Sequence, residues 1–224
     1  RDTIDDTVDL YGGRKVVFEP NKGPQTQFLA SSEREVLYGG SAGGGKSYAM
    51  LADPLRYMGH PSFSGLLLRH TTEELRELIF KSKELYPQIW KGIKWSERKM
   101  QWEAPSGARL WMSYLDRDDD VLRYQGLAFS WIGFDELTQW STPFSWNYMR
   151  SRLRSTASDL PVYMRATTNP GGPGHQWVKK MFIDPAPYGR AFDATNIETG
   201  KPLKYPDNHE RAGQALFQRR FIPA

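Results

Sequence analysis

Short apolar runs alternate along most of the chain with longer segments in which apolar residues recur at helical spacing. A short apolar run bounded by turn residues predicts a buried strand, and the longer spacing predicts an amphipathic helix. Strands are predicted within residues 15–20, 35–40, 65–70, 129–136 and 161–169, and helices within 23–31, 46–59, 71–86, 143–155 and 175–182. Strands that alternate with helices indicate parallel βαβ units and a sheet covered on both faces.

Local signals refine several of these elements. Pro54 should bend or interrupt the helix at 46–59, because proline removes a helical hydrogen bond. Thr71 and Glu74 have the spacing of a capping box at the start of the next helix. Residues 99–115 alternate about Pro-Ser-Gly, which predicts a β-hairpin. The expected fold is therefore α/β: a mostly parallel sheet with helices on both faces and an inserted β-hairpin.

The chain has 224 residues, with 30 Lys and Arg against 26 Asp and Glu, so its formal net charge is +4. This length suits one large domain, predicted over residues 15–224, preceded by a flexible arm over residues 1–14. The mild positive charge is compatible with nucleic acid but does not require it. Because cysteine is absent, a disulfide framework and a thiolate metal site are excluded. No apolar run approaches the ~18 residues needed to span a membrane.

The stretch YGGSAGGGKSYAM, residues 38–50, is crowded with glycine up to Lys46 and Ser47. Glycine costs stability unless the backbone needs unusual dihedrals or a ligand must approach it closely. A Gly-x-x-x-x-Gly-Lys-Ser spacing between a predicted strand and a predicted helix matches a phosphate-binding P-loop. Its N–H groups would hold phosphate oxygens, Lys46 would reach the β- and γ-phosphates, and Ser47 would bind Mg²⁺. The predicted nucleotide-binding residues here are Gly40, Ser41, Ala42, Gly43, Gly44, Gly45, Lys46 and Ser47.

The predicted strand at 129–136 ends in Asp135 and Glu136. Beside a P-loop, Asp135 would hold Mg²⁺ through water, and Glu136 would act as the general base toward the attacking water. The pair predicts an ATPase that uses ATP and Mg²⁺. The acidic run at 116–120 is a rival metal site, but its successive carboxylates cannot all face one ion. We therefore expect that run to be a solvated loop that caps the following helix.

Thr167, Thr168 and Asn169 end the predicted strand after Glu136, ahead of a glycine-rich turn. Polar groups at this position could sense the γ-phosphate and pass the change to a mobile loop. A polar strand end, at which Asn-Pro opens a turn, explains the same residues equally well. The two interpretations remain open from the residues alone.

Several motifs occur in an order that resembles the ATPase (motor) domain of a tailed-bacteriophage large terminase subunit. They are GSAGGGKS, LLLRHT, YQGLAFSWIGFDE, RSRLRS, TTNPGGPGHQW and RRFIPA, and the likeness covers residues 25–224. The resemblance implies a P-loop NTPase of the RecA/ASCE type that hydrolyses ATP to pump double-stranded viral DNA into a procapsid. It also implies a C-terminal nuclease domain that would begin where this chain ends, so nuclease activity is not expected from this fragment.

The resemblance further implies roles outside the P-loop. Gln27, or less favourably Gln25, resembles the glutamine that contacts the adenine, and residues 167–169 match the coupling motif. Arg123 lies where the family can supply an arginine finger to a neighbouring subunit. The arginines that compete for that role are Arg69, Arg150, Arg152 and Arg154. A surface ion pair remains the alternative for each of them.

Contacts with DNA leave the weakest signal, because a packaging motor should hold the phosphate backbone without reading sequence. The candidates are Arg150, Arg154, Lys179, Lys180, Arg219 and Arg220. On the predicted helix at 143–155, Arg150 and Arg154 would share one face. Three tryptophans are expected in the core rather than against bases, since a duplex offers no unstacked bases. They are Trp102, Trp111 and Trp177.

The partners implied are double-stranded DNA, the portal protein, the small terminase subunit and further copies of the chain in a ring, although an isolated domain could be monomeric. The expected location is the host cell cytoplasm and, transiently, the portal vertex of the procapsid, with no membrane. Two alternatives remain. A superfamily 1 or 2 helicase shares the P-loop and the acidic pair but needs a second RecA-like domain. A nucleotide-gated assembly module would not need Glu136.

Overall fold

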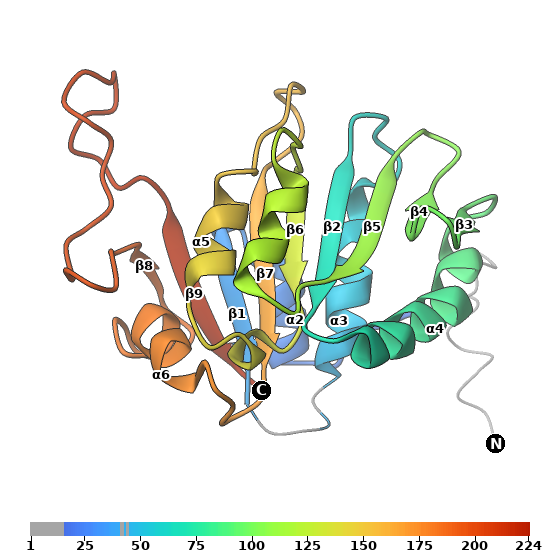
Figure 1. Cartoon of the computed structure of the whole chain (residues 1–224), viewed down its shortest axis with the longest axis horizontal. Helices are drawn as coiled ribbons and strands as arrows, with labels where there is room; N and C mark the ends of the chain where they lie inside the picture. Colours follow the sequence, from blue (N-terminus) through green and yellow to red (C-terminus); the bar gives the residue numbers. More distant parts are fainter. Residues whose placement is uncertain (1–15, 41–42, 44) are drawn as a thin grey trace.

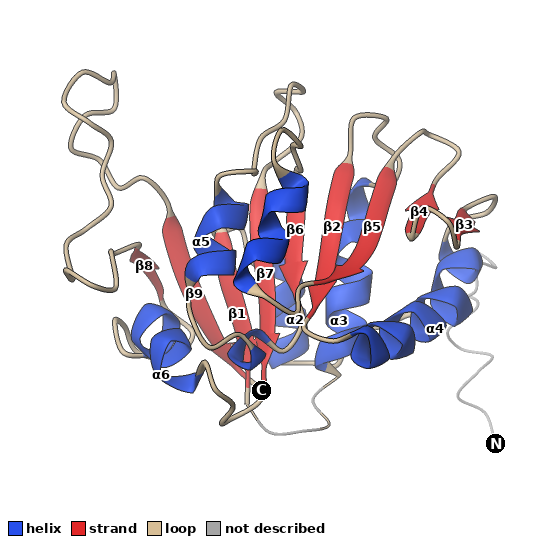
Figure 2. Ribbon diagram, in the orientation of Figure 1, coloured by secondary structure: helices blue, strands red, loops and turns tan. Residues whose placement is uncertain are grey.

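The computed structural model describes residues 16–40, 43 and 45–224, so the arm predicted at 1–14 lies outside the described residues. Within these ranges, nine strands form one sheet in the order β3-β4-β5-β2-β6-β7-β1-β9-β8 (Figures 1 and 2). The parallel central strands are β1 (Glu35–Gly39), β2 (Ser64–Arg69), β5 (Arg109–Tyr114), β6 (Trp131–Phe134), β7 (Tyr163–Thr168) and β9 (Gln218–Pro223).

Antiparallel strands extend the sheet at both edges. On one side β3 (Lys94–Ser96) pairs with β4 (Gln101–Glu103), and β4 forms the predicted hairpin with β5. On the other side β8 (Ala191–Asp193) pairs with β9. Neither β8 nor β9 was predicted from the Pro- and Gly-rich sequence after residue 185.

Helices cover both faces of the sheet (Figure 2). The α-helices are α2 (Pro24–Ala30), α3 (Lys46–Ala52), α4 (Thr72–Ile89), α5 (Phe144–Arg150) and α6 (His175–Val178). The shorter helical turns are η1 (Asp53–Tyr57), η2 (Asp118–Tyr124), η3 (Leu137–Gln139) and the π-helical η4 (Lys179–Ile183). Among the described residues, no helix combines the length and the hydrophobicity that crossing a membrane requires.

Alternation along each strand divides the core between these two faces. Leu67 packs in the cluster that contains α3 and α4, whereas Leu66 and Leu68 pack in the cluster that contains α5 and η2. Successive strand side chains point to opposite faces, so a strand buried on both sides is apolar throughout. This explains why the uninterrupted run at 65–68 forms a central strand.

The local signals at the ends of the first helices are confirmed. The predicted helix at 46–59 changes to the 3₁₀ turn η1 at Asp53, with Pro54 in the first turn of η1. The capping box is present: Thr71 Oγ1 accepts from the Glu74 N–H at 3.3 Å, and Glu74 Oε2 accepts from the Thr71 N–H at 3.3 Å. The pairing of the central strands also confirms the predicted class, because each central pair is parallel.

One predicted strand is absent from the described residues, and one predicted helix is shorter than expected. Residues 16–20 form no strand, and Val17 and Phe18 instead pack beside the α3–α4 cluster. The helix predicted at 143–155 ends at Arg150, because the backbone at 152–154 bonds to Phe129. The Phe129 N–H donates to the Arg152 carbonyl at 3.0 Å, and the Arg154 N–H donates to the Phe129 carbonyl at 3.0 Å. Arg150 and Arg154 therefore do not share a helix face.

Candidate nucleotide-binding and catalytic site

The carboxyl ends of β1, β6 and β7 meet at one edge of the sheet, where parallel α/β folds bind their ligands. A cavity of about 430 Å³ opens there. Its described lining residues are Gly43, Gly45, Lys46, Ser47, Tyr48, Lys81, Glu136 and Asn169. The structure thus brings together predicted residues from the glycine loop, from the acidic pair and from the end of β7.

The backbone after β1 requires glycine at its first and last loop positions. Gly40 has φ 137° and Gly45 has φ 67°, both in the left-handed half of φ space. A Cβ atom at Gly45 would also lie 2.7 Å from Nε2 of Gln25, closer than van der Waals contact permits. The predicted contacts of Ser41, Ala42 and Gly44 lie outside the described residues.

Lys46 is the first residue of α3 and is buried, with a fractional exposure of 7%. Its Nζ donates to the Gly40 carbonyl at 3.4 Å, so the side chain curls back over the loop. Burial lowers the pKa of Lys46, and Glu136 and Asp135 oppose that shift. A partly dehydrated ammonium group at the base of a glycine loop suits the binding of a polyphosphate.

Asp135 lies directly after β6 and is fully buried. The Thr167 hydroxyl donates to its Oδ1, and Nε of Arg69 lies 2.9 Å from its Oδ2. Burial raises the pKa of Asp135, while Arg69 and Thr167 act in the opposite direction. Arg69 was considered as a finger for a neighbouring subunit, but its side chain is only 9% exposed and is paired within its own chain.

Glu136 has a strained backbone: its φ of 63° lies in the left-handed region, which residues other than glycine rarely adopt. Such conformations cost about 1–3 kcal/mol and persist where surrounding contacts hold them. Here the Glu136 N–H donates to Thr167 Oγ1 at 3.0 Å, and Nδ2 of Asn169 donates to Glu136 Oε1 at 2.7 Å. Burial raises the pKa of Glu136, and the neighbouring charge of Asp135 raises it further.

The three polar residues that end β7 all contact the segment after β6. Thr167 bridges Asp135 and the Glu136 backbone, Asn169 binds the Glu136 side chain, and the Thr168 hydroxyl donates to Thr138 Oγ1 at 3.0 Å. These contacts connect the predicted coupling residues to the predicted base. Chain order alone gave no sign that Thr167 contacts both members of the acidic pair.

The site has oxygen atoms of the kind that bind magnesium and its water ligands. Mg²⁺ prefers oxygen ligands, and Ser47 and Glu136 present oxygens at the cavity. Oδ1 of Asn169 is buried without a hydrogen-bond donor among the described residues, and Oδ2 of Asp135 has an ion pair but no aligned hydrogen bond. Both atoms can accept hydrogen bonds from water, so the residues present fit a hydrated magnesium ion bound with a nucleotide.

Comparison with known proteins identifies the family. A family model described as the phage terminase large subunit matches residues 32–208. The chain belongs to this family. No curated protein matches it.

Solved structures of terminases share the fold of this terminase-family chain. The ATPase domain of the Thermus phage P74-26 large terminase is 13% identical with a TM-score of 0.54, over 98% of this chain and 84% of that one. The large terminase of the thermophilic bacteriophage D6E is 20% identical with a TM-score of 0.57, over 74% and 42%. Its complex with ADP is 18% identical with a TM-score of 0.55, over 70% and 42%. The chain therefore matches less than half the length of the D6E terminase.

The glutamine beside the terminase P-loop is Gln25, whereas Gln27 was favoured from the sequence. Gln25 is buried, and its Nε2 donates to the Gly45 carbonyl at 2.9 Å while its Oε1 accepts from the Asn21 N–H at 2.6 Å. Gln27 is exposed on the other side of the short helix α2. A glutamine that contacts the loop is better placed than Gln27 to act on nucleotide bound there.

The candidate finger Arg123 lies on η2 with its side chain 40% exposed. Its Nη2 lies 2.8 Å from Asp120 Oδ1, and its guanidinium lies over the Tyr114 ring, 5.6 Å from the centroid. The surface ion pair considered as the alternative is therefore present. A role toward a neighbouring subunit stays a prediction.

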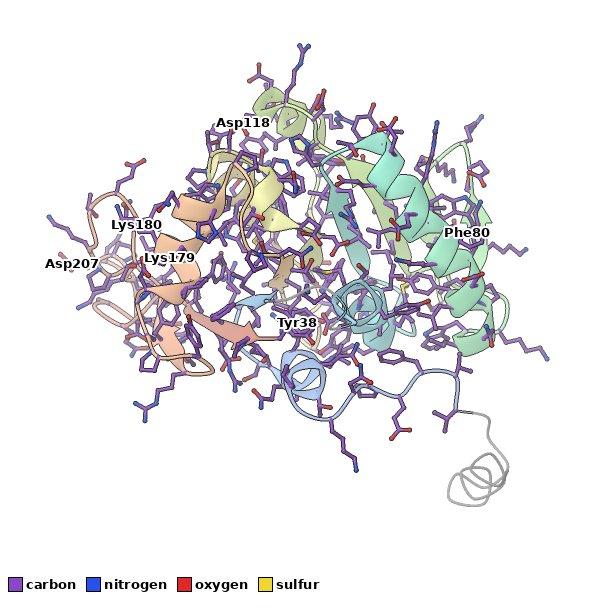
Figure 3. All side chains as sticks on the ribbon, turned by 90° about the horizontal axis from the view of Figure 1, so that it is seen from below. Tyr38, Phe80, Asp118, Lys179, Lys180 and Asp207 are labelled. Atoms are coloured by element: carbon purple, nitrogen blue, oxygen red, sulfur yellow. The ribbon has the colours of Figure 1, made fainter. Side chains whose placement is uncertain are left out.

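Several of the basic residues predicted to contact DNA have partners within the chain. Arg220 donates from Nε to the Gly189 carbonyl at 2.8 Å, and its Nη1 lies 3.6 Å from Glu33 Oε1. Arg150 and Arg219 both pair with the buried carboxylate of Glu35, and Arg219 is only 1% exposed. The prediction that Arg219 contacts DNA is therefore wrong. Lys179 and Lys180 lie exposed on the side of the molecule away from Phe80 of α4 (Figure 3). Lys179 is 3.1 Å from Asp184, and Arg154 is exposed beyond the end of α5.

Carboxylates of the acidic run bind neighbouring protein donors, and Asp118 accepts from the hydroxyls of Thr142 at 2.8 Å and Ser145 at 3.1 Å. Asp120 Oδ2 accepts the N–H groups of Asp116 and Arg117 at 3.0 Å, which caps η2 as expected. In the part of the chain that is described, no group of three or more metal-ligating side chains occurs. The expected core tryptophans pack inside: Trp102 and Trp177 are buried, and Trp111 is partly buried against the α5 cluster.

Proposed function

We propose that this chain is the motor part of a phage large terminase, which hydrolyses ATP to move double-stranded DNA into a procapsid. The observation that carries the proposal is the single cavity shared by Lys46, Ser47, Glu136 and Asn169. These residues come from three segments far apart in sequence, and each has the side chain that its proposed step requires. Membership of the terminase family supports DNA as the substrate, and the ADP complex of the D6E terminase supports nucleotide binding.

A magnesium–ATP complex would supply the phosphoryl group and partly neutralise its charge. Lys46 and the loop N–H groups would bind the phosphates, and Ser47 with Asp135 would hold the metal, Asp135 through water. Glu136 takes a proton from the attacking water as general base. Asn169 orients Glu136, and Thr167 fixes the backbone between Asp135 and Glu136. Gln25, next to the loop, is the residue proposed to contact the adenine.

The proposed partners are double-stranded DNA, the portal protein, the small terminase subunit and other copies of this chain in a ring. The proposed location of DNA packaging is the host cell cytoplasm, at the portal vertex of the procapsid. Lys179, Lys180 and Arg154 remain the proposed contacts with the DNA backbone. Arg150 is a weaker proposal, because its guanidinium is paired with Glu35.

A DNA-stimulated ATPase assay tests the function. The wild-type chain should hydrolyse ATP in the presence of Mg²⁺, and Lys46→Ala should abolish that activity. Strand separation of a duplex would indicate a helicase instead. Nucleotide binding without turnover would indicate a nucleotide-gated assembly module.

A further inference from the structure

A second lysine reaches the nucleotide cavity from outside the P-loop and the strand ends. Lys81 of α4 lines the same cavity as Lys46, Ser47 and Glu136. We propose that Lys81 binds the terminal phosphate of a nucleoside triphosphate held in its own subunit. This inference rests on the proposed nucleotide-binding function and adds a phosphate ligand to it.

The helix α4 turns Lys81 toward the rest of the molecule. Leu78 and Leu85, one turn before and one turn after it, are both buried, and Lys81 itself is 27% exposed on its side chain. Residues three and four apart share a helix face. In contrast, the preceding Phe80 is 63% exposed and lies on the outer side of α4 (Figure 3). Lys83 also points outward and pairs with Glu97.

The present partner of Lys81 can be exchanged at little cost. Lys81 Nζ lies 2.6 Å from Oε1 of Glu77, one turn earlier on α4, and the Glu77 side chain is 61% exposed. Exposed pairs of this kind stabilise a protein weakly, because water and salt screen them. A phosphate in the cavity offers more charge in a less hydrated place, so the ammonium gains by leaving Glu77.

The charges around the cavity call for a second cation. Asp135 and Glu136 both lie next to the predicted phosphate position, and Arg69 is committed to Asp135. Among the described residues that line the cavity, Lys46 and Lys81 supply the positive charge. Two lysines on separate helices can thus hold separate phosphates of one nucleotide.

Equilibrium binding of a non-hydrolysable ATP analogue and of ADP, each with Mg²⁺, tests the assignment. Lys81→Ala should bind the analogue about tenfold more weakly, the range for a lost hydrogen bond to a charged group. Its affinity for ADP, which lacks the terminal phosphate, should stay within about twofold of wild type. Lys81→Arg should recover part of the loss. Lys83→Ala is the matched control, since Lys83 lies on the same helix outside the cavity, and it should bind both nucleotides as wild type does.

Two results would overturn the inference. Lys81→Ala that binds the analogue as tightly as Lys83→Ala does would show that the ammonium makes no phosphate contact. An equal loss for the analogue and for ADP would place Lys81 on phosphates common to both. Thermal melting of each variant separates these results from unfolding. Wild-type protein that bound neither nucleotide would instead contradict the proposed function itself.

Discussion

The side-chain amide of Asn169 donates a 2.7 Å hydrogen bond to Oε1 of Glu136, and so connects the end of β7 to the predicted base after β6. The two strands are parallel neighbours, so their carboxyl ends lie side by side. Thr167 adds a second connection by accepting the Glu136 N–H. A shift at the end of β7 would therefore change the direction in which Glu136 points, which is a physical route from the predicted coupling residues to the predicted base.

Asn169→Ala should move the acidic limb of the ATPase pH profile to higher pH. A hydrogen bond to the ionised carboxylate favours that form, so its removal raises the pKa of Glu136 beyond the increase already caused by burial and Asp135. Because a general base acts when deprotonated, the rate rises with pH through this pKa. Turnover near neutral pH should fall several-fold, as measured by kcat from about pH 5 to pH 9. An acidic limb identical to that of wild type would contradict the role of Asn169.

Glu136→Gln and Lys46→Ala should fail at different steps. The glutamine keeps the shape of Glu136 but cannot accept the proton, so turnover should fall by roughly 10²-fold or more while nucleotide affinity stays nearly intact. Lys46→Ala removes the cation that lines the cavity at the glycine loop and is proposed to contact phosphate, so it should weaken binding itself. Binding isotherms paired with steady-state rates distinguish the two. Near-normal hydrolysis by Glu136→Gln would exclude Glu136 as the base.

Glu35→Gln should destabilise the fold without acting at the nucleotide site. Glu35 is fully buried, and although burial alone would raise its pKa, Arg150 and Arg219 lower it on balance. Leaving the buried guanidinium of Arg219 and the partly exposed guanidinium of Arg150 without their carboxylate costs about 3–5 kcal/mol, measurable by urea unfolding at neutral pH. The control Glu97→Gln removes the carboxylate of the exposed pair with Lys83 and should change the midpoint of urea unfolding little.

The same carboxylate predicts an acid-dependent loss of stability. A folded-state pKa below the unfolded value stabilises the protein above the unfolded value of about 4.5, and that stability is lost as pH falls through the lower, folded value. Wild-type protein should therefore lose unfolding free energy below about pH 4.5 more steeply than Glu35→Gln. Parallel curves for the two proteins would show that Glu35 is not ionised in the fold.

Features set by local sequence were predictable. The P-loop spacing, the capping box at Thr71 and the break at Pro54 each depend on a few adjacent residues, and the strand before Asp135 is marked by its own apolar run. The order of strands and helices then placed the P-loop and Asp135 at one edge of the sheet. Fold class and the centre of the site followed from those signals.

Features set by distant contacts were not predictable. The helix after Pro143 ends early because the backbone of Arg152 and Arg154 forms hydrogen bonds with the backbone of Phe129. Lys81 faces the cavity only because α4 packs where it does, and neighbouring residues carry no mark of that. Arg150 and Arg219 look like surface charges in sequence, yet both meet a carboxylate more than a hundred residues away. Charge alone does not reveal which arginine is structural.

The arginine finger is best tested by mixing two inactive proteins. Arg69 and Arg150 are held by carboxylates of their own chain, whereas Arg123 is 40% exposed and its partner Asp120 lies at the surface. A finger from a neighbouring subunit contributes about 10³ to 10⁵ in rate. Specific activity should therefore rise with protein concentration, and Arg123→Ala should remove that rise while keeping nucleotide affinity.

Arg123→Ala retains an intact P-loop and Lys46→Ala an intact finger, so mixing them should restore activity. As a control, a chain with both substitutions should not rescue Arg123→Ala, since neither protein then carries a finger. If activity is independent of concentration and mixing restores nothing, Arg123 does not act between subunits, and the partly exposed Arg152 and the exposed Arg154 become the arginines to substitute next.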